Sequence, residues 1–284
     1  QDLLFEEGFI EKNSKVLENI AKESKAPLII GYIRKENLNI YNSAAVCYDG
    51  QIQSTYDKVL LPTYDVFDED RYFSSGKHPK IINIPFKGAE LKVGLQICED
   101  LWDQQYDCKV SMIQKEMGAD FIVNISASPY QQDRLLKRKD IILNKVQETS
   151  LPFFYCNAIG GQDELIFDGQ SLAFSEEGIV IGYGTAFKEE IIMVDLKSKN
   201  KIDIKIQPRE EKMYNALCLG LKDYFLKTGH KEAVLGLSGG IDSALVASIA
   251  SDALGPENVH CISLPSKYSS DHSLSDAKEL AMNL

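Results

Sequence analysis

Several features that this sequence lacks limit what the protein can be. Its 284 residues contain no apolar run that reaches the roughly 18 residues needed to cross a bilayer, and no signal peptide opens them. Positive charge is not in excess, because the formal net charge is −11. That balance disfavours a general affinity for nucleic acid or for an anionic membrane surface. We therefore expect a cytoplasmic protein with no nucleic-acid or membrane partner, and the net charge says little about small phosphorylated ligands, which local loops hold.

Closely spaced cysteine pairs are also absent. The six cysteines lie far apart with no CxxC spacing, and Cys47 and Cys156 occur in the apolar contexts AAVCY and FFYCNA. This pattern indicates reduced, buried thiols and neither a zinc ribbon nor a disulfide framework. An initial methionine is missing too, since the chain opens with Gln1 in QDLLFEEGF. We expect these residues to be a piece of a longer polypeptide.

What is present is ordinary for a globular protein. Hydrophobic residues make up 44% of the chain and charged residues 26%, and the length allows two compact domains or one large one. Up to residue 196, β-like and helix-like segments alternate, which predicts a layered α+β or α/β domain. The dipeptide Asp49-Gly50 is a strong hairpin signal between two strands. Further strands are predicted at 26–33, 80–86, 91–98, 119–128, 152–160, 168–175, 179–184 and 189–196, and helices at 9–24, 109–117 and 133–150.

The composition changes after residue 195. The segment 196–208 is polar, contains Pro208 and a short β-like IDIKI, and is the best linker candidate. Beyond it we expect a helix from Arg209 that Gly229 closes as a C-cap. Strand 233–237, helix 241–254, strand 258–264 and helix 272–283 follow. This order predicts a parallel βαβ unit that starts a doubly wound domain, so domains are expected at 1–195 and 209–284.

The turn GLSGGIDS between that strand and helix has the character of a phosphate-binding loop. Glycines let backbone amides approach an anion, and the helix that follows adds its positive N-terminal end. Ser238 and Ser243 can donate hydroxyl hydrogen bonds, whereas Asp242 would repel phosphate and is better suited to hold Mg²⁺. A plain strand-to-helix turn capped by Asp242 or Ser243 is the alternative. The candidate ATP-binding residues are Gly236, Leu237, Ser238, Gly239, Gly240, Ile241, Asp242 and Ser243.

The loop is not a Walker A motif, because its lysine is absent. It resembles the pyrophosphate loop of the ATP pyrophosphatases, which adenylate a carboxyl or carbonyl group and release pyrophosphate. The later stretch LPSKYSSDHSLSDAKELAMNL is similar to the segment that follows the loop in NAD synthetases. The resemblance places its PSxYSS part close to the adenylate site.

A second group of reactive residues lies upstream. In VGLQICEDLW, Cys98 ends an apolar strand and is followed by Glu99 and Asp100, which should raise the thiol pKa unless a cation is near. Lys58 is a candidate cation, because it ends another strand before the acidic, tyrosine-rich loop VLLPTYDVFDEDRYF. Taken singly, Cys98 would be a small core residue and Lys58 a solvated one.

Together these segments resemble the glutamine-hydrolysing branch of the nitrilase superfamily, through KxxLPxYxxFxExRxF followed by GxxICED. The resemblance implies an αββα sandwich with a Glu–Lys–Cys triad. Cys98 would be the nucleophile that forms a γ-glutamyl thioester and releases ammonia. Lys58 would stabilise the oxyanion, and Glu69 would orient Lys58 and the substrate.

The same resemblance implies which residues bind glutamine, and it shows one difference from the family pattern. Tyr64, Ser128 and Arg134 fall where the family binds glutamine, and Glu99 would hold the ligand or the strand end. The base Glu of the triad precedes a stretch like GYPxEDLLF in the family, and we expect it to be cut off here. Glu6 and Glu7 do not match its position. Proton transfer to and from the thiol would then lack its catalyst.

A nitrilase-like amidase ahead of a pyrophosphate loop is similar to the glutamine-dependent NAD synthetases. This resemblance implies ATP- and glutamine-dependent amidation of deamido-NAD to NAD, with Mg²⁺, in a homo-oligomer, and it implies a chain truncated at both ends. The fold expected is α/β, an αββα sandwich followed by the start of a Rossmann-like nucleotide-binding domain.

Three other readings are possible. The chain could be a stand-alone carbon–nitrogen hydrolase with a degenerate nucleotide-binding appendage. It could be another amidotransferase, such as a GMP synthetase with a Cys–His–Glu triad, although none of the four histidines has a suitable context. It could also be a non-catalytic scaffold, against which the retention of Lys58, Glu69, Cys98 and the loop argues.

Overall fold

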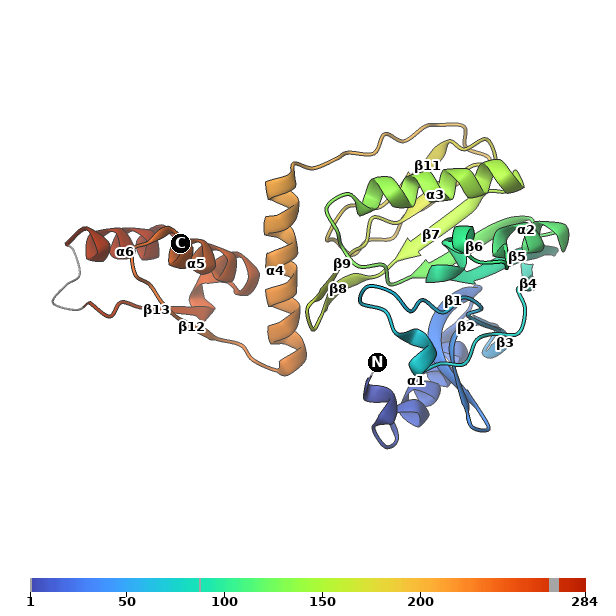
Figure 1. Ribbon diagram of the computed structural model, residues 1–284, viewed down its shortest axis with the longest axis horizontal. Coiled ribbons are helices and arrows are strands. Elements are labelled where there is room, and N and C mark those ends of the chain that lie inside the picture. Colours follow the sequence, from blue (N-terminus) through green and yellow to red (C-terminus); the bar gives the residue numbers. More distant parts are fainter. Residues whose placement is uncertain (1, 87, 266–270) are drawn as a thin grey trace.

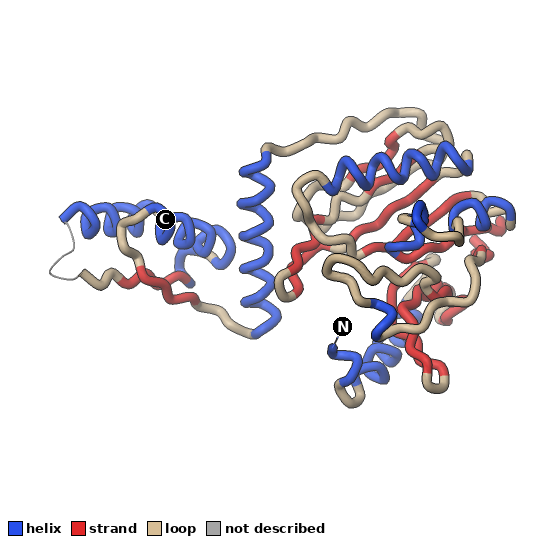
Figure 2. The backbone as a smooth tube through the Cα atoms, viewed as in Figure 1, coloured by secondary structure: helices blue, strands red, loops and turns tan. Residues whose placement is uncertain are grey.

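The computed structural model describes residues 2–86, 88–265 and 271–284. The residues before α4 (Arg209–Thr228) form a body of sheets and helices, and a smaller α/β unit lies on the far side of α4 (Figures 1 and 2). No helix of this described part is long and apolar enough to cross a membrane. Residues 266–270 of the PSxYSS stretch lie outside the described residues.

The first sheet is antiparallel and three-stranded, in the order β1-β2-β3. Asp49 and Gly50 have φ values of 52° and 76°, which is the left-handed pair that a tight two-residue hairpin requires and confirms the predicted turn. The elements of this layer are α1 (Phe9–Glu23), β1 (Leu28–Glu36), β2 (Asn39–Tyr48) and β3 (Gln51–Asp57). Leu17 and Ala21 of α1 pack on one face of the sheet.

The second sheet has six strands in the order β11-β10-β7-β6-β5-β4. Its strands are β4 (Ile81–Phe86), β5 (Ala89–Ile97), β6 (Phe121–Ser126), β7 (Phe153–Asn157), β10 (Leu172–Phe174) and β11 (Val180–Tyr183). The central strands β5, β6 and β7 run parallel. Their carboxyl ends therefore meet at one edge of the sheet, where loops after parallel strands gather functional residues.

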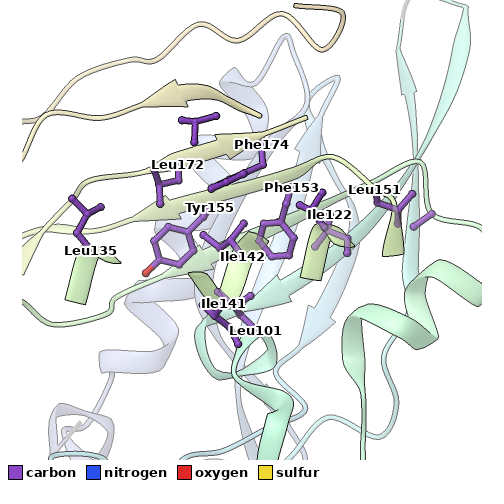
Figure 3. Packing of buried hydrophobic residues seen from close by; sticks show 13 residues of the cluster. Leu101, Ile122, Leu135, Ile141, Ile142, Leu151, Phe153, Tyr155, Leu172 and Phe174 are labelled. Carbon is purple, nitrogen blue, oxygen red and sulfur yellow. The ribbon is translucent and has the colours of Figure 1, made fainter. Parts of the chain in front are cut away.

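Alternation along β5 explains how the layers assemble. Val93, Leu95 and Ile97 point to the three-stranded sheet and form a core with it, whereas Gln96 points to α2 (Val110–Glu116) and donates to Gln114. Helix α3 (Arg134–Thr149) covers the same face as α2, and Figure 3 shows its Ile141, Ile142 and Leu135 against Phe153, Tyr155 and Leu172 of the sheet. The layers run helix, sheet, sheet, helix, which confirms the predicted αββα sandwich.

Three details differ from the prediction. The strand expected at 152–160 ends at Asn157, and the chain continues into a separate hairpin of β8 (Ile159–Gln162) and β9 (Leu165–Asp168). The run 189–196 forms no strand. Cys156 is exposed and not buried, because alternation along β7 turns it away from the core that Phe153 and Tyr155 enter. All six cysteines are free, as predicted.

The remaining elements form the predicted parallel unit. Strand β12 (Ala233–Gly236) pairs in parallel with β13 (Val259–Ile262) across α5 (Ile241–Leu254), and α6 (Asp271–Asn283) follows. Gly229 ends α4 in a left-handed conformation and donates to Leu226 O, as the C-cap prediction requires. Helix α4 packs between α5 and the β8–β9 hairpin, where Gly161 N donates to Asp223 Oδ2 at 2.8 Å.

Candidate functional site

The candidate nucleophile Cys98 lies at the carboxyl edge of the parallel strands. Cys98 directly follows β5 and opens a short 3₁₀ turn with φ 44°, a conformation that is unfavourable for a residue with a Cβ and that concentrates at functional sites. Neighbouring β6 supports this turn, because Asn124 Nδ2 donates to the Cys98 carbonyl at 3.3 Å and Ser126 Oγ donates to Asn124 Oδ1 at 2.7 Å. The thiol is half-buried.

Lys58 reaches this region from the other sheet. It follows β3, is 1% exposed, and donates to both carboxylate oxygens of Glu69 at 2.8 and 2.7 Å. Burial disfavours the charged ammonium, but Cys98 in its thiolate form and the Glu69 carboxylate favour it more strongly and raise the pKa of Lys58. The structure therefore brings Lys58, Glu69 and Cys98 together and keeps the lysine cationic.

The thiol remains harder to ionise than a free cysteine. Burial raises the pKa of Cys98, Lys58 opposes the rise, and the carboxylates of Glu69 and Glu99 add to it. The cation next to Cys98 therefore offsets only part of the cost of forming a thiolate, so nucleophilic attack requires a group that accepts the thiol proton.

Glu99, which follows Cys98 in the chain, lines a pocket. It is 3% exposed and accepts hydrogen bonds from the hydroxyls of Tyr64 (2.9 Å) and Tyr106 (3.1 Å). Burial raises the pKa of Glu99, although both hydroxyls and Lys58 favour its charged form. The pocket has a volume of about 420 Å³, which suits a ligand of amino-acid size. Its lining residues are Tyr64, Glu99, Trp102, Gln104, Gln105 and Tyr106.

Ser128 is held in a rigid loop after β6. Asn157 Oδ1 accepts from its backbone amide at 2.8 Å, and Arg138 donates to its carbonyl at 2.8 Å. Arg138 is fully buried and also pairs with buried Asp168, Nη1 to Oδ1 2.8 Å. Burial raises the pKa of Asp168, and Arg138 opposes that rise.

Arg134 reaches the pocket by another route. It begins α3, and its guanidinium lies 5.8 Å from the ring of Trp102, which lines the pocket. Its buried Nε has no hydrogen-bond partner among the described residues, so a donor is available there. Of the predicted glutamine-binding residues, Tyr64 and Glu99 thus line the pocket, and Arg134 stands at Trp102. Ser128 has no direct contact with these residues in the described structure.

The sequence reasoning missed two buried ionic groups. Asp100 was considered only as an acid that perturbs the thiol, yet it is fully buried and makes four hydrogen bonds. Arg138 lies in the charged run RLLKRKD, which looks like a solvated helix face. The only signal for Arg138 was its four-residue spacing from Arg134 on α3, which puts both on one side of the helix.

The candidate phosphate loop has the geometry that its sequence suggests. Gly239 has φ 84°, and a Cβ there would lie 2.3 Å from the Ser273 carbonyl oxygen, so only glycine fits. Ser238 and Ser243 contact each other through their hydroxyls at 3.0 Å, and Ser243 Oγ donates to Gly240 O. Leu237 is the buried anchor of the loop. Ser238, Gly240, Ile241 and Asp242 are exposed, and Gly236 ends β12.

Asp242 is the one predicted metal ligand. The described residues contain no group of three or more His, Cys, Asp or Glu side chains that could hold a metal ion. A single exposed carboxylate beside a loop of amides fits Mg²⁺ that arrives with a nucleotide, because Mg²⁺ keeps several waters and binds one or two carboxylates plus phosphate oxygens. It does not fit a resident all-protein metal site.

Two family models match different parts of the chain. The family model for carbon–nitrogen hydrolase matches residues 11–205, and that for NAD synthase matches residues 213–284. The glutamine-dependent NAD(+) synthetase of Thermotoga maritima is 38% identical over all of this chain and 55% of its own length. That of Synechocystis is 39% identical over all of this chain and 54% of its own length.

A solved structure is similar over the whole chain as well. The glutamine-dependent NAD+ synthetase from Acinetobacter baumannii, in complex with ADP, superposes with a TM-score of 0.83 at 31% identity and covers 100% of this chain and 53% of its own. The chain thus spans about half the length of the curated relatives it matches.

Proposed function

The chain belongs to the carbon–nitrogen hydrolase family, and from this premise we propose that it works as part of a glutamine-dependent NAD(+) synthetase. Residues 1–195 hydrolyse glutamine, and residues from 209 onward begin the domain that uses ATP. The overall reaction amidates the nicotinate carboxyl of deamido-NAD, consumes ATP and glutamine, and releases AMP, pyrophosphate and glutamate. The observation that carries this proposal is the presence of both sites, Cys98 with Lys58 and the 236–243 loop, on one chain.

The glutaminase chemistry follows from the arrangement around Cys98. The sulfur attacks the side-chain carboxamide carbon of glutamine and forms a tetrahedral oxyanion, which the Lys58 ammonium stabilises. Expulsion of ammonia leaves a γ-glutamyl thioester, and water then releases glutamate and the thiol. Glu69 fixes the Lys58 ammonium in place. The thiol proton passes to the departing ammonia through the base glutamate that the family resemblance implies.

Binding of free glutamine requires recognition of its two charged ends. The Glu99 carboxylate, oriented by Tyr64 and Tyr106, suits the α-ammonium group. The Arg134 guanidinium, with a free donor, suits the α-carboxylate. Ser128 serves the carboxamide end through a loop that is already fixed before the ligand arrives.

The second site handles ATP. The amides and hydroxyls of the 236–243 loop bind the phosphates, and Asp242 contacts the accompanying Mg²⁺, which supplies charge neutralisation on the phosphate oxygens when bound. Adenylation activates the deamido-NAD carboxyl, and ammonia then displaces AMP. Direct transfer keeps the ammonia unprotonated, since free ammonia at neutral pH is almost entirely ammonium. We place this reaction in the cytoplasm and in a homo-oligomer.

The test uses the protein expressed from its complete reading frame. It is incubated with ATP, Mg²⁺ and deamido-NAD, with glutamine or ammonium chloride as the nitrogen source. NAD and AMP should form with either donor. Glutamate released without NAD would instead support the stand-alone hydrolase with a degenerate nucleotide-binding appendage.

A further inference from the structure

The carboxylate of Asp100 lies directly behind the reacting pair. It is 0% exposed and uses both of its oxygens. Oδ1 accepts from the backbone amides of Val59 (3.1 Å) and Leu60 (2.9 Å). Oδ2 accepts from the amide of Ile97 (3.0 Å) and from the hydroxyl of Tyr56 (2.9 Å). Four donors converge on one buried side chain, which is full use of a carboxylate's acceptor capacity.

These donors belong to two different layers of the sandwich. Val59 and Leu60 directly follow Lys58, whereas Ile97 directly precedes Cys98. The strand before Lys58 belongs to the three-stranded sheet and the strand before Cys98 to the six-stranded sheet, so no sheet ladder joins them. Asp100 therefore connects the main chain at Lys58 to the main chain at Cys98 through hydrogen bonds.

We propose that Asp100 is a positioning residue that sets the separation between the Lys58 ammonium and the Cys98 sulfur. This inference rests on the proposed glutaminase function. Stabilisation of an oxyanion depends steeply on geometry, since a displacement of about 1 Å of a catalytic group can cost about 10²-fold in rate. Burial raises the pKa of Asp100 to about 6, although the hydrogen bonds from the amides of Ile97 and Leu60 lower it. The side chain is thus ionised at neutral pH and can accept from all four donors.

The matched variant is Asp100→Asn. It keeps the shape of the side chain and an oxygen that can accept from the amides of Val59 and Leu60. Its NH₂ group cannot accept from the Ile97 amide, so the hydrogen bond to the end of β5 is lost. Tyr56→Phe is the milder variant, because it removes one hydrogen bond and leaves all three backbone contacts. Asp103→Asn is the control, because Asp103 is equally buried but pairs with Lys145 of α3 (2.6 Å) and has no hydrogen bond to the main chain next to Lys58 or Cys98 among the described residues.

The protein from the complete reading frame is assayed for glutamine hydrolysis, with ammonia-dependent NAD formation as the measure of intact folding. Asp100→Asn should lower kcat about 10- to 100-fold while KM for glutamine stays within about threefold, because the Asp100 side chain bonds to Tyr56, Val59, Leu60 and Ile97 and to none of the residues that line the pocket. Tyr56→Phe should lower kcat less, also at unchanged KM. Asp103→Asn should keep the wild-type kcat.

An unchanged kcat in Asp100→Asn, or a change confined to KM, would overturn the proposal. An equal loss in Asp103→Asn would also overturn it, since any buried acid would then serve. If Asp100→Asn does not fold, Asp100→Glu decides by the same criterion, because it keeps the carboxylate but shifts it by one methylene from the amides of Val59, Leu60 and Ile97. Alkylation of Cys98 by iodoacetamide should slow in parallel with kcat, because a displaced Lys58 favours the thiolate less. That rate is measurable even if the wild type hydrolyses no glutamine, which would refute the proposed function separately.

Discussion

The two candidate sites on this chain are built in opposite ways. In the body that holds Cys98, several ionisable side chains are buried and paired with one another, as in Lys58–Glu69 and Arg138–Asp168. At the phosphate loop the polar side chains are exposed and contact only near neighbours, such as Ser238 with Ser243. The first site is buried and held by ion pairs, and the second is open to solvent.

The packing beneath each site follows the same contrast. The body that holds Cys98 has two extended apolar cores, one under α3 and one between the sheets. The phosphate-loop unit has one small cluster of three buried residues, Leu237, Ala247 and Ala277. Around it, Leu245 and Val246 of α5 are about half exposed, at 50% and 54%. Catalysis at a buried cysteine needs a preorganised site, whereas a loop that binds triphosphate must admit and release a large anion.

The largest effect should come from Cys98→Ala in the protein expressed from its complete reading frame. Loss of the nucleophile should reduce glutamine-dependent NAD synthesis by at least about 10³-fold and leave ammonia-dependent synthesis intact. Steady-state assays with the two nitrogen donors measure this. Cys156→Ala is the control, because Cys156 is an exposed thiol of the same body. Loss of both activities in Cys98→Ala would break the separation between the two sites.

The reciprocal change is Asp242→Ala. Loss of the Mg²⁺-binding carboxylate should reduce NAD synthesis about 10²- to 10³-fold with either nitrogen donor, while glutamine hydrolysis continues. Asp276→Ala, at an exposed acid on α6, should preserve both. Normal synthesis by Asp242→Ala would mean that the loop does not bind the metal–nucleotide complex.

Within the buried site, Arg138→Met should be strongly destabilising. It leaves Asp168 buried without its cation, which costs about 3–5 kcal/mol of unfolding free energy. Arg134→Met should lower the free energy of unfolding by less than about 1 kcal/mol, because Arg134 is half-exposed and has no ion pair among the described contacts. Its expected effect is a higher KM for glutamine. Urea unfolding measures the stability of each variant, and initial rates at several glutamine concentrations measure KM. Adding Asp168→Asn to Arg138→Met should recover part of the loss, and a wild-type-like Arg138→Met would refute the ion pair's role.

The smallest change tests the open site. Gly239→Ala puts a methyl group against the Ser273 carbonyl at a left-handed φ, which costs about 1–2 kcal/mol of backbone strain alone. Gly236→Ala is the matched control, since nothing lies within 4 Å of its added Cβ. Thermal unfolding and ATP titration should show weaker stability and ATP affinity for Gly239→Ala only. Equal behaviour of the two variants would mean that the loop adapts freely.

Much of the fold was predictable because it depends on short-range patterns. The Asp49-Gly50 hairpin, the Gly229 cap and the parallel unit around 241–254 all follow from residues near in sequence. The β8–β9 hairpin was missed because FFYCNAIG reads as one apolar run. Contact with α4, through Asp223 and Gly220, favours a break after Asn157.

The sequence by itself determined a layered domain of alternating strands and helices, the candidate residues at strand ends and the glycine-dependent loop, since side-chain period and turn geometry are local properties. The αββα arrangement was expected only from the family resemblance. Only the tertiary structure decided which charged residues are buried and what they bind. Lys58 meets Glu69 across 11 residues, Arg138 meets Asp168 across 30, and Asp100 meets Val59 across 41. Burial of a charge is stable only when such a distant partner arrives with it, and that pairing is a property of the packed layers.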